Sequence, residues 1–125
     1  LVFALIDPTA DSMELVNAGH YAPLIVSADG TAKFARTTPR RPLGTDPDDR
    51  TSSAFRFGTG DTLLLYTDGL VERRDEHIDI GLARLGDCAP ELAREDVESA
   101  LKSVVSQVQG DVREDDVTAL AIRRA

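Results

Sequence analysis

The stretch TLLLYTDG at residues 62–69 constrains the fold most, because a short apolar run ends on a charge and a glycine. An apolar run of this length, followed by a flexible residue, predicts a buried strand that leaves its sheet and argues against a helix. Asp68 would then lie at the strand end, where its carboxylate needs a cation, a backbone donor or water as a partner. Gly69 would let the chain turn closely around that partner. An ordinary Asp-Gly turn is the alternative interpretation.

The segments before and after this run also carry strand patterns. Two apolar runs flank the turn cluster DPTAD, which predicts a hairpin. Two more strands are expected on either side of Asp29-Gly30, a pair that favours a tight hairpin. The expected strands are residues 1–6, 12–18, two within 23–36, 54–57 and 117–123, in addition to the run that ends at Asp68.

A helical region is expected after Asp68, and residues 94–111 show it most clearly. Apolar residues recur there with helical spacing and form one stripe. Acidic residues at the start suit the positive end of a helix dipole, and Gly110 suits its end. Antiparallel strands followed by segregated helices predict an α+β fold. The stripe consists of Val97, Leu101, Val104, Val105 and Val108.

The length and charge of the chain limit its function further. The chain has 125 residues, which is the size of one domain, and no apolar run reaches the ~18 residues of a membrane span. A formal net charge of -8 disfavours a nucleic-acid surface and favours cations as partners. The single cysteine, Cys88, is expected to pack as a small hydrophobic residue. We therefore expect a cytoplasmic protein that contacts neither nucleic acid nor membrane.

Carboxylates stand at two strand junctions, Asp68 after its strand and the EDD cluster at residues 114–116 before the last strand. If these two strands are antiparallel neighbours, Asp68 and Asp115 could share a cation. Adjacent residues of an extended chain point to opposite faces, so only one of Asp115 and Asp116 would reach it. Oxygen ligands without paired His or Cys favour Mg²⁺ or Mn²⁺. Solvated turn acids are the alternative interpretation.

The Asp-Gly pair after an apolar strand also suggests the aspartate-nucleophile phosphatases of the haloacid dehalogenase type. Their motif resembles D-x-D-G, in which the first acid is the nucleophile. The corresponding residue in this sequence is Tyr66. The order of strands before helices also differs from the alternating strands and helices of that family. Both observations disfavour this interpretation.

Three stretches together resemble one known family. They are NAGHYAPLIV at residues 17–26, GDTLLLYTDGLVERRD at 60–75 and DDVTALAIR at 115–123, and PLG at 42–44 agrees with them. They look like the bacterial metal-dependent PPM-type serine/threonine phosphatases (protein phosphatase type 2C), in the branch of SpoIIE and RsbU. The resemblance implies an antiparallel β-sandwich with helices on its outer faces and a two-metal centre of Mn²⁺ or Mg²⁺. It also implies that a metal-activated water hydrolyses phosphoserine or phosphothreonine.

The resemblance implies roles for individual residues. Asp68 and Asp115 match metal-binding acids of the catalytic centre, and Asp116 occupies a neighbouring position. Gly69 would permit close approach of the backbone to this centre. Arg40 and Arg41 on a long loop, together with Arg73, are candidates for docking a phosphoprotein.

Three further residues belong to the matching motifs without an assigned chemical role. Asn17 and His20 lie in the NAGH motif, and a structural role is expected for both. Glu72 follows Asp68 closely and could touch substrate, or it could be a solvated residue at a helix start.

The chain departs from the family at its start. The family's earlier metal-binding motifs have no counterpart among Asp7, Asp11 and Glu14. We therefore expect residues 1–125 to be the C-terminal portion of a catalytic domain, weak or inactive alone. Exposed strand edges such as residues 1–6 would favour a homodimer. By resemblance the partner is a phosphorylated anti-sigma-factor antagonist, and the alternative function is a non-catalytic interaction module.

Overall fold

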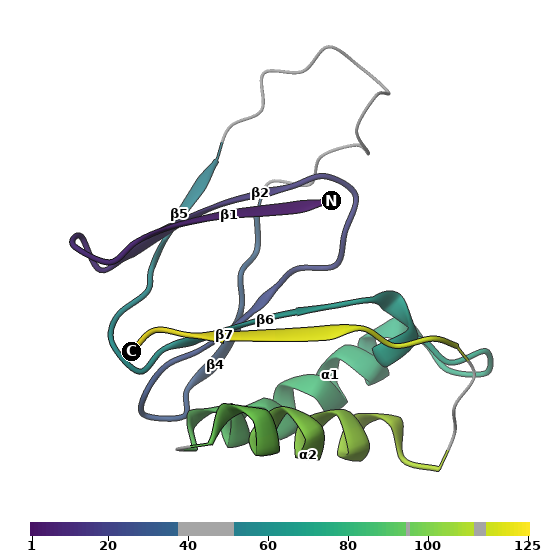
Figure 1. Ribbon diagram of the computed structural model, residues 1–125. Helices are drawn as coiled ribbons and strands as arrows, with labels where there is room; N and C mark the ends of the chain where they lie inside the picture. Colours follow the sequence, from purple (N-terminus) through teal and green to yellow (C-terminus); the bar gives the residue numbers. More distant parts are fainter. Residues whose placement is uncertain (38–51, 95, 112–114) are drawn as a thin grey trace.

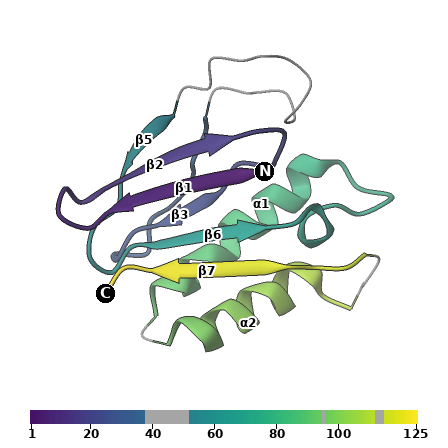
Figure 2. The same cartoon turned by 45° about the horizontal axis from the view of Figure 1, so that its top comes forward.

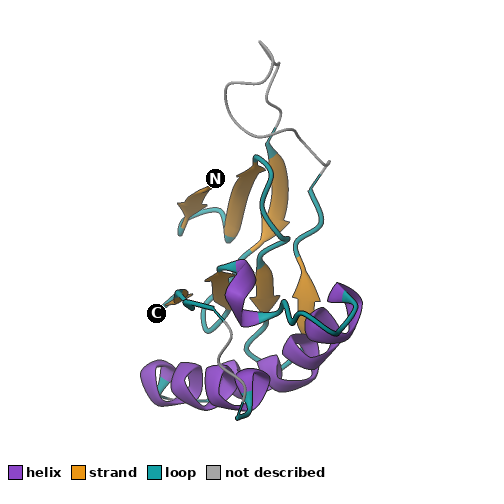
Figure 3. Cartoon of the chain, turned by 90° about the vertical axis from the view of Figure 1, so that its right-hand side faces the viewer, coloured by secondary structure: helices purple, strands orange, loops and turns teal. Residues whose placement is uncertain are grey.

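The computed structural model describes residues 1–37, 52–94, 96–111 and 115–125. Two antiparallel sheets lie one above the other, and the helices lie beneath the second sheet (Figure 1). Seen from the side, the chain therefore forms three layers, which are sheet, sheet and helices (Figure 3). This arrangement confirms the predicted α+β class and the antiparallel sandwich.

The first sheet contains three strands in the order β1-β2-β5. Its strands alternate between covered and exposed side chains, as expected for a sheet with one solvated face. Met13 and Leu15 of the central strand point inward and are fully buried. The strands are β1 (Val2–Asp7), β2 (Ser12–Asn17) and β5 (Ser53–Arg56).

The second sheet contains four strands in the order β4-β3-β6-β7. Its strand β6 is covered on both faces, which explains the unbroken apolar run in the sequence. Leu63 packs among the residues between the two sheets, whereas Leu64 packs among those between the second sheet and the helices. The strands are β3 (Leu24–Val26), β4 (Ala32–Phe34), β6 (Thr62–Tyr66) and β7 (Ala119–Arg123).

Two α-helices cover the outer face of the second sheet. The stripe predicted for α2 (Val97–Gln109) is confirmed, because Val104 and Val108 are fully buried. Asp96 caps its start by accepting a hydrogen bond from the amide of Glu98, and Gly110 ends it with a φ of 58°. The other helical segments are α1 (Ile78–Cys88) and the short 3-10 helices η1 (Asp68–Leu70) and η2 (Ala89–Ala93).

Cys88 at the end of α1 packs against the apolar residues between the second sheet and the helices, as predicted. Burial raises the pKa of its thiol, and the nearby Glu91 and Asp87 add to this effect. Within the described ranges, no helix has the length and apolar character needed to cross a bilayer.

Candidate active site

The two carboxylate-bearing segments meet because β6 and β7 are antiparallel neighbours, which is the condition on which the shared-cation hypothesis depended. The ladder pairs Tyr66 with Ala119. Beyond it, the amide of Thr67 donates to the carbonyl oxygen of Thr118 at 3.0 Å, and the amide of Thr118 donates to Thr67 Oγ1 at 2.9 Å. Asp68 therefore leaves the sheet beside the segment that carries Asp115.

Asp68 begins the η1 turn and has an exposed side chain. Its Oδ1 accepts a hydrogen bond from the amide of Gly69 at 3.0 Å. Its carbonyl oxygen accepts from the amides of Val71 at 2.9 Å and Glu72 at 2.8 Å. The backbone of the turn is thus held by local bonds, and the carboxylate remains open to solvent.

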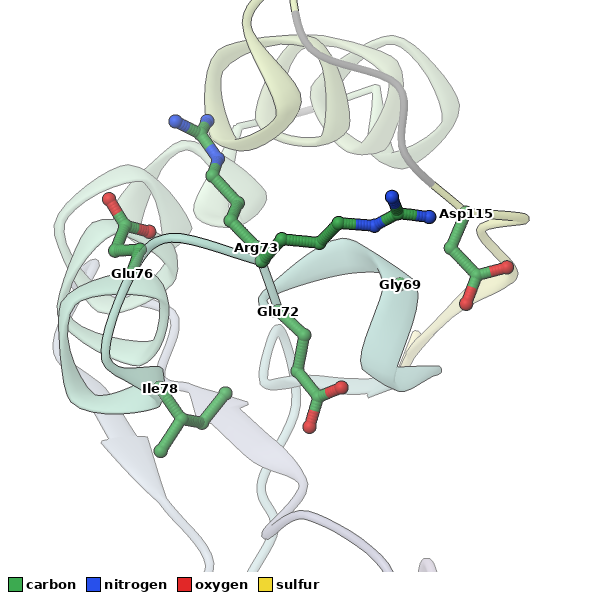
Figure 4. A pocket seen from close by; sticks show the side chains of 7 residues that line it. Gly69, Glu72, Arg73, Glu76, Ile78 and Asp115 are labelled. Atoms are coloured by element: carbon green, nitrogen blue, oxygen red, sulfur yellow. The ribbon is translucent and has the colours of Figure 1, made fainter.

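Gly69 lies directly against the segment of Asp115 and Asp116. A Cβ atom placed on Gly69 would be 2.4 Å from the carbonyl oxygen of Asp116 and 3.3 Å from the Cβ of Asp115. The contact to a backbone oxygen is far too short for any side chain, so glycine is needed for this approach. In Figure 4, Asp115 lies beside the turn that carries Gly69.

Asp115 and Asp116 differ in their surroundings. Asp115 Oδ1 accepts a hydrogen bond from the amide of Asp116 at 2.8 Å, and the Asp115 side chain lines a pocket. Asp116 presents its backbone carbonyl to Gly69, and its side chain is exposed. The pair therefore contributes one pocket-facing carboxylate and one backbone contact.

Two pockets flank the η1 turn, and Glu72 lines both of them. One has a volume of about 420 Å³ and contains Asp115 (Figure 4). The other has a volume of about 520 Å³ and contains Asp68. The two acids thus face neighbouring pockets that meet at Glu72. The first is lined by Gly69, Glu72, Arg73, Arg74, Glu76, Ile78 and Asp115, and the second by Gly19, His20, Tyr21, Thr67, Asp68 and Glu72.

Glu72 also connects the η1 turn to residues 17–21, which we call the NAGHY loop. The phenol of Tyr21 donates a short hydrogen bond to Glu72 Oε1. This bond, with smaller effects of burial and of charge on Glu72 and Asp68, raises the pKa of Tyr21 to about 12. The sequence analysis did not predict this hydrogen bond. The two residues are 51 positions apart, and no local pattern around either residue indicates the other as its partner.

Asn17 holds the same loop from within, as expected for a structural residue. Its Oδ1 accepts from the amide of His20 at 3.0 Å, and its Nδ2 donates to the carbonyl oxygen of His20 at 2.8 Å. Tyr66 of β6 adds a hydrogen bond from its phenol to the carbonyl oxygen of Ala22 at 2.9 Å. The backbone around His20 is therefore fixed on both sides.

Arg73 lines the Asp115 pocket, but its guanidinium also has a structural task. Its Nη2 donates to the carbonyl oxygens of Val108 at 2.9 Å and Gln109 at 3.1 Å, at the end of α2. Such donors satisfy the unpaired carbonyls of a helix C-terminus. Arg73 thus ties the turn after Asp68 to the helix that leads toward Asp115. Arg40 and Arg41 lie outside the described residues.

The donor atoms near the turn fit part of a hard-cation centre. Asp68 and Asp115 offer carboxylate oxygens, which Mg²⁺ and Mn²⁺ prefer. Across the described ranges, however, no cluster of three or more His, Cys, Asp or Glu side chains is placed to hold a metal ion. These residues would therefore supply part of the ligands of such a centre.

Solved domains of the PP2C phosphatase type show the same stacked antiparallel sheets and helices, so the chain has the fold of these domains. The family model described as "Stage II sporulation protein E (SpoIIE)" matches residues 1–125, and the chain belongs to this family.

Individual relatives agree with this assignment. The RsbU and RsbW domains of Rv1364c from Mycobacterium tuberculosis are 30% identical with a TM-score of 0.88, over 99% of this chain and 36% of that one. The phosphatase domain of SpoIIE from Bacillus subtilis, described as Mn presoaked, is 18% identical with a TM-score of 0.67, over 99% of this chain and 56% of that one. Protein IcfG of Synechocystis sp. is 26% identical over an alignment 129 residues long, which covers 99% of this chain and 20% of IcfG. The chain thus spans about a fifth of IcfG and between a third and three fifths of these two solved chains.

Proposed function

We propose that the chain is part of a metal-dependent phosphatase that hydrolyses phosphoserine or phosphothreonine in a protein. The observation that carries this proposal is the meeting of Asp68 and Asp115 at the ends of β6 and β7, with Gly69 packed between their backbones. This close approach requires glycine at residue 69 and brings the two acidic segments together. Within a binding module, this concentration of negative charge would need another explanation.

In this proposal Asp68 and Asp115 each bind a divalent cation, Mn²⁺ or Mg²⁺, of a two-metal centre. When bound, such cations supply an activated water and offset the charge that develops on the phosphoryl group. Gly69 and the backbone of Asp116 set the distance between the two acidic segments. Glu72 and Arg73 hold the turn through Tyr21 and through the end of α2, respectively.

The remaining ligands would come from another part of the same catalytic domain. Strands β1 and β7 are the edges of the two sheets, and both lie on the same side of the molecule (Figures 2 and 3). Apolar side chains are exposed there, with 58% of Phe3 and 52% of Leu120 accessible to solvent. We take residues 1–125 as the C-terminal portion of the domain and this flank as the place where the rest of the domain packs.

The natural substrate in this proposal is a phosphorylated regulatory protein of the anti-sigma-factor-antagonist kind. Membership of the SpoIIE family supports this class of partner. A non-catalytic interaction module is the second candidate, and the small number of acidic ligands among the described residues favours it.

The test is phosphate release by the longer polypeptide that contains residues 1–125, measured with an aryl phosphate and with a phosphoserine peptide. We expect release that requires Mn²⁺ or Mg²⁺, stops on chelation and returns when the metal is restored. The Asp68→Asn variant serves as the control for contaminating phosphatases. A folded polypeptide that releases no phosphate at saturating metal would favour the interaction module.

A homodimer of the isolated residues 1–125 is also proposed. Leu1, just before β1, is 65% exposed, and Phe3 and Leu5 of β1 are each 58% exposed. An apolar edge strand favours pairing with another chain. Light scattering should give twice the mass of the chain at micromolar concentration, and Leu5→Lys should shift it toward the monomer. A monomer at all concentrations would contradict this prediction.

A further inference from the structure

We propose that His20 donates the proton that the serine or threonine oxygen of the substrate takes up when its bond to phosphorus breaks. This inference rests on the proposed phosphatase function and deepens it by assigning a second chemical role in the same site. His20 lines the 520 Å³ pocket that also contains Asp68. The bound phosphate ester and the imidazole would therefore share one pocket.

The imidazole is held in one orientation. Its Nδ1 lies 2.9 Å from the carbonyl oxygen of Tyr21, and since a carbonyl can only accept, Nδ1 carries a hydrogen. Its ring meets the ring of Tyr66 edge-on, with centroids 6.3 Å apart and an angle of 71° between the planes. The two hydrogen bonds between Asn17 and the His20 backbone fix the chain on which the ring is mounted.

This orientation leaves Nε2 as the reactive nitrogen. Among the described residues, none forms a hydrogen bond with Nε2. His20 is half-buried, and Nε2 is not among the buried atoms that lack a partner, so this nitrogen is open to solvent and to a ligand. Because Nδ1 keeps its hydrogen in both protonation states, a proton can be gained or lost only at Nε2.

The other hydroxyl groups that line the pocket already form hydrogen bonds within the protein. The phenol of Tyr21 donates to Glu72, and this bond raises its pKa to about 12, so it is a poor acid near neutrality. The hydroxyl of Thr67 accepts from the amide of Thr118. Glu72 accepts from Tyr21, and Asp68 is assigned to cation binding. Among the side chains that line this pocket, the imidazole of His20 is therefore the remaining proton donor.

The reaction balances with water as the second reactant. The oxygen of water forms a bond to phosphorus, and the bond between phosphorus and the serine oxygen breaks with its electron pair on that oxygen. The proton on Nε2 moves to this oxygen and gives the free serine hydroxyl. The proton lost by the attacking water then restores the imidazolium, directly or through solvent. The products are the dephosphorylated protein and inorganic phosphate.

The dependence of the rate on the leaving group tests the assignment. A serine alkoxide is a poor leaving group and needs the proton, whereas p-nitrophenolate leaves without it. We expect His20→Gln in the complete metal-loaded polypeptide to lower kcat for a phosphoserine peptide by about 100-fold or more, the size typical of a lost general acid. Hydrolysis of p-nitrophenyl phosphate should fall by less than about 10-fold.

Two substitutions separate the two ring nitrogens. Glutamine places an amide nitrogen near the position of Nε2 and can donate a hydrogen bond, but it cannot transfer a proton. Asparagine places its amide nitrogen near the position of Nδ1, so His20→Asn keeps the bond to the Tyr21 carbonyl and lacks Nε2. Both variants should show the same loss on the phosphoserine peptide relative to p-nitrophenyl phosphate.

His77 provides the matched control, because it is the other histidine of the chain. It caps the start of α1, where its Nδ1 accepts from the amide of Asp79 at 3.3 Å, and its side chain is 73% exposed. Asparagine is an equally good cap, so His77→Asn should retain both activities.

The readout is the ratio of the rate on the phosphoserine peptide to the rate on p-nitrophenyl phosphate, since misfolding would lower both rates equally. Equal losses on both substrates, or no loss on the peptide, would overturn the role of His20 while the phosphatase function stands. A wild-type polypeptide inactive on both substrates at saturating metal would overturn the proposed function and this inference together.

Discussion

Replacing Asp115 with asparagine is expected to lower metal-dependent phosphate release by about 10²–10³-fold, the loss typical when one charge-stabilising group is removed. The carboxylate of Asp115 faces a pocket beside Gly69, where a neutral amide would bind a divalent cation more weakly. Asp68→Asn should cause a loss of the same size. The measurement is kcat/KM for a phosphoserine peptide as a function of Mn²⁺ concentration.

The double variant tests whether the two acids act together. Residues that act as a unit show non-additive losses, so Asp68→Asn combined with Asp115→Asn should be little worse than either change alone. Losses that multiply would mean that the acids act separately, in keeping with the different pockets that they line. Higher metal concentration should partly rescue each single variant.

Two other aspartate substitutions serve as controls for this experiment. Asp116→Asn should lose much less activity, because Asp116 meets Gly69 through its backbone carbonyl and its side chain is exposed. Asp87→Asn changes an exposed acid on α1 and should behave as the wild type. A variant of Asp115 that keeps full activity at low metal would exclude this acid from the catalytic centre.

The strands could be predicted from sequence because their signals are local. Alternation over residues 12–17 and the Asp-Gly turn at residues 29–30 each specify a structure within a few positions. The division of these strands between two sheets has no such local signal. It arises where the NAGHY loop carries the chain from β2 in the first sheet to β3 in the second.

The candidate site also combines a contact that follows from local sequence patterns with contacts that do not. The approach of Asp68 to the Asp115 segment follows from one pairing of two predicted strands, a pairing that the sequence analysis took as its condition. The bonds from Tyr21 to Glu72 and from Arg73 to the end of α2 join residues that are far apart in sequence. Their partners depend on how helices and loops pack onto the sheet, which the local pattern does not specify.

Helix α1 was anticipated only as part of a general helical region, and its glycines explain why. Gly81 and Gly86 both lie within Ile78–Cys88, and glycine in a helix interior is unfavourable by about 1 kcal/mol relative to alanine. The helical pattern of its apolar residues is therefore weakened. The structure shows that packing requires glycine at residue 81 but not at residue 86.

Gly81→Ala is expected to destabilise the fold by about 3 kcal/mol, at the upper end of the usual cost of overpacking. A Cβ atom at Gly81 would lie 1.8 Å from the carbonyl oxygen of Val71 and 2.8 Å from its carbonyl carbon. Gly81 and Val71 are both buried, so the helix must move away from the segment that follows Asp68. The free energy of unfolding, measured by urea denaturation, reports this loss.

Gly86→Ala in the same helix is the matched control. The nearest atom to a Cβ there is Cε2 of Phe34 at 3.6 Å, which is an ordinary contact. Alanine should therefore stabilise the helix by roughly 0.5–1 kcal/mol. Opposite signs for the two substitutions would show that Gly81 sets the distance between α1 and the turn that carries Asp68. A Gly81→Ala variant as stable as the wild type would mean that α1 does not fix the position of that turn.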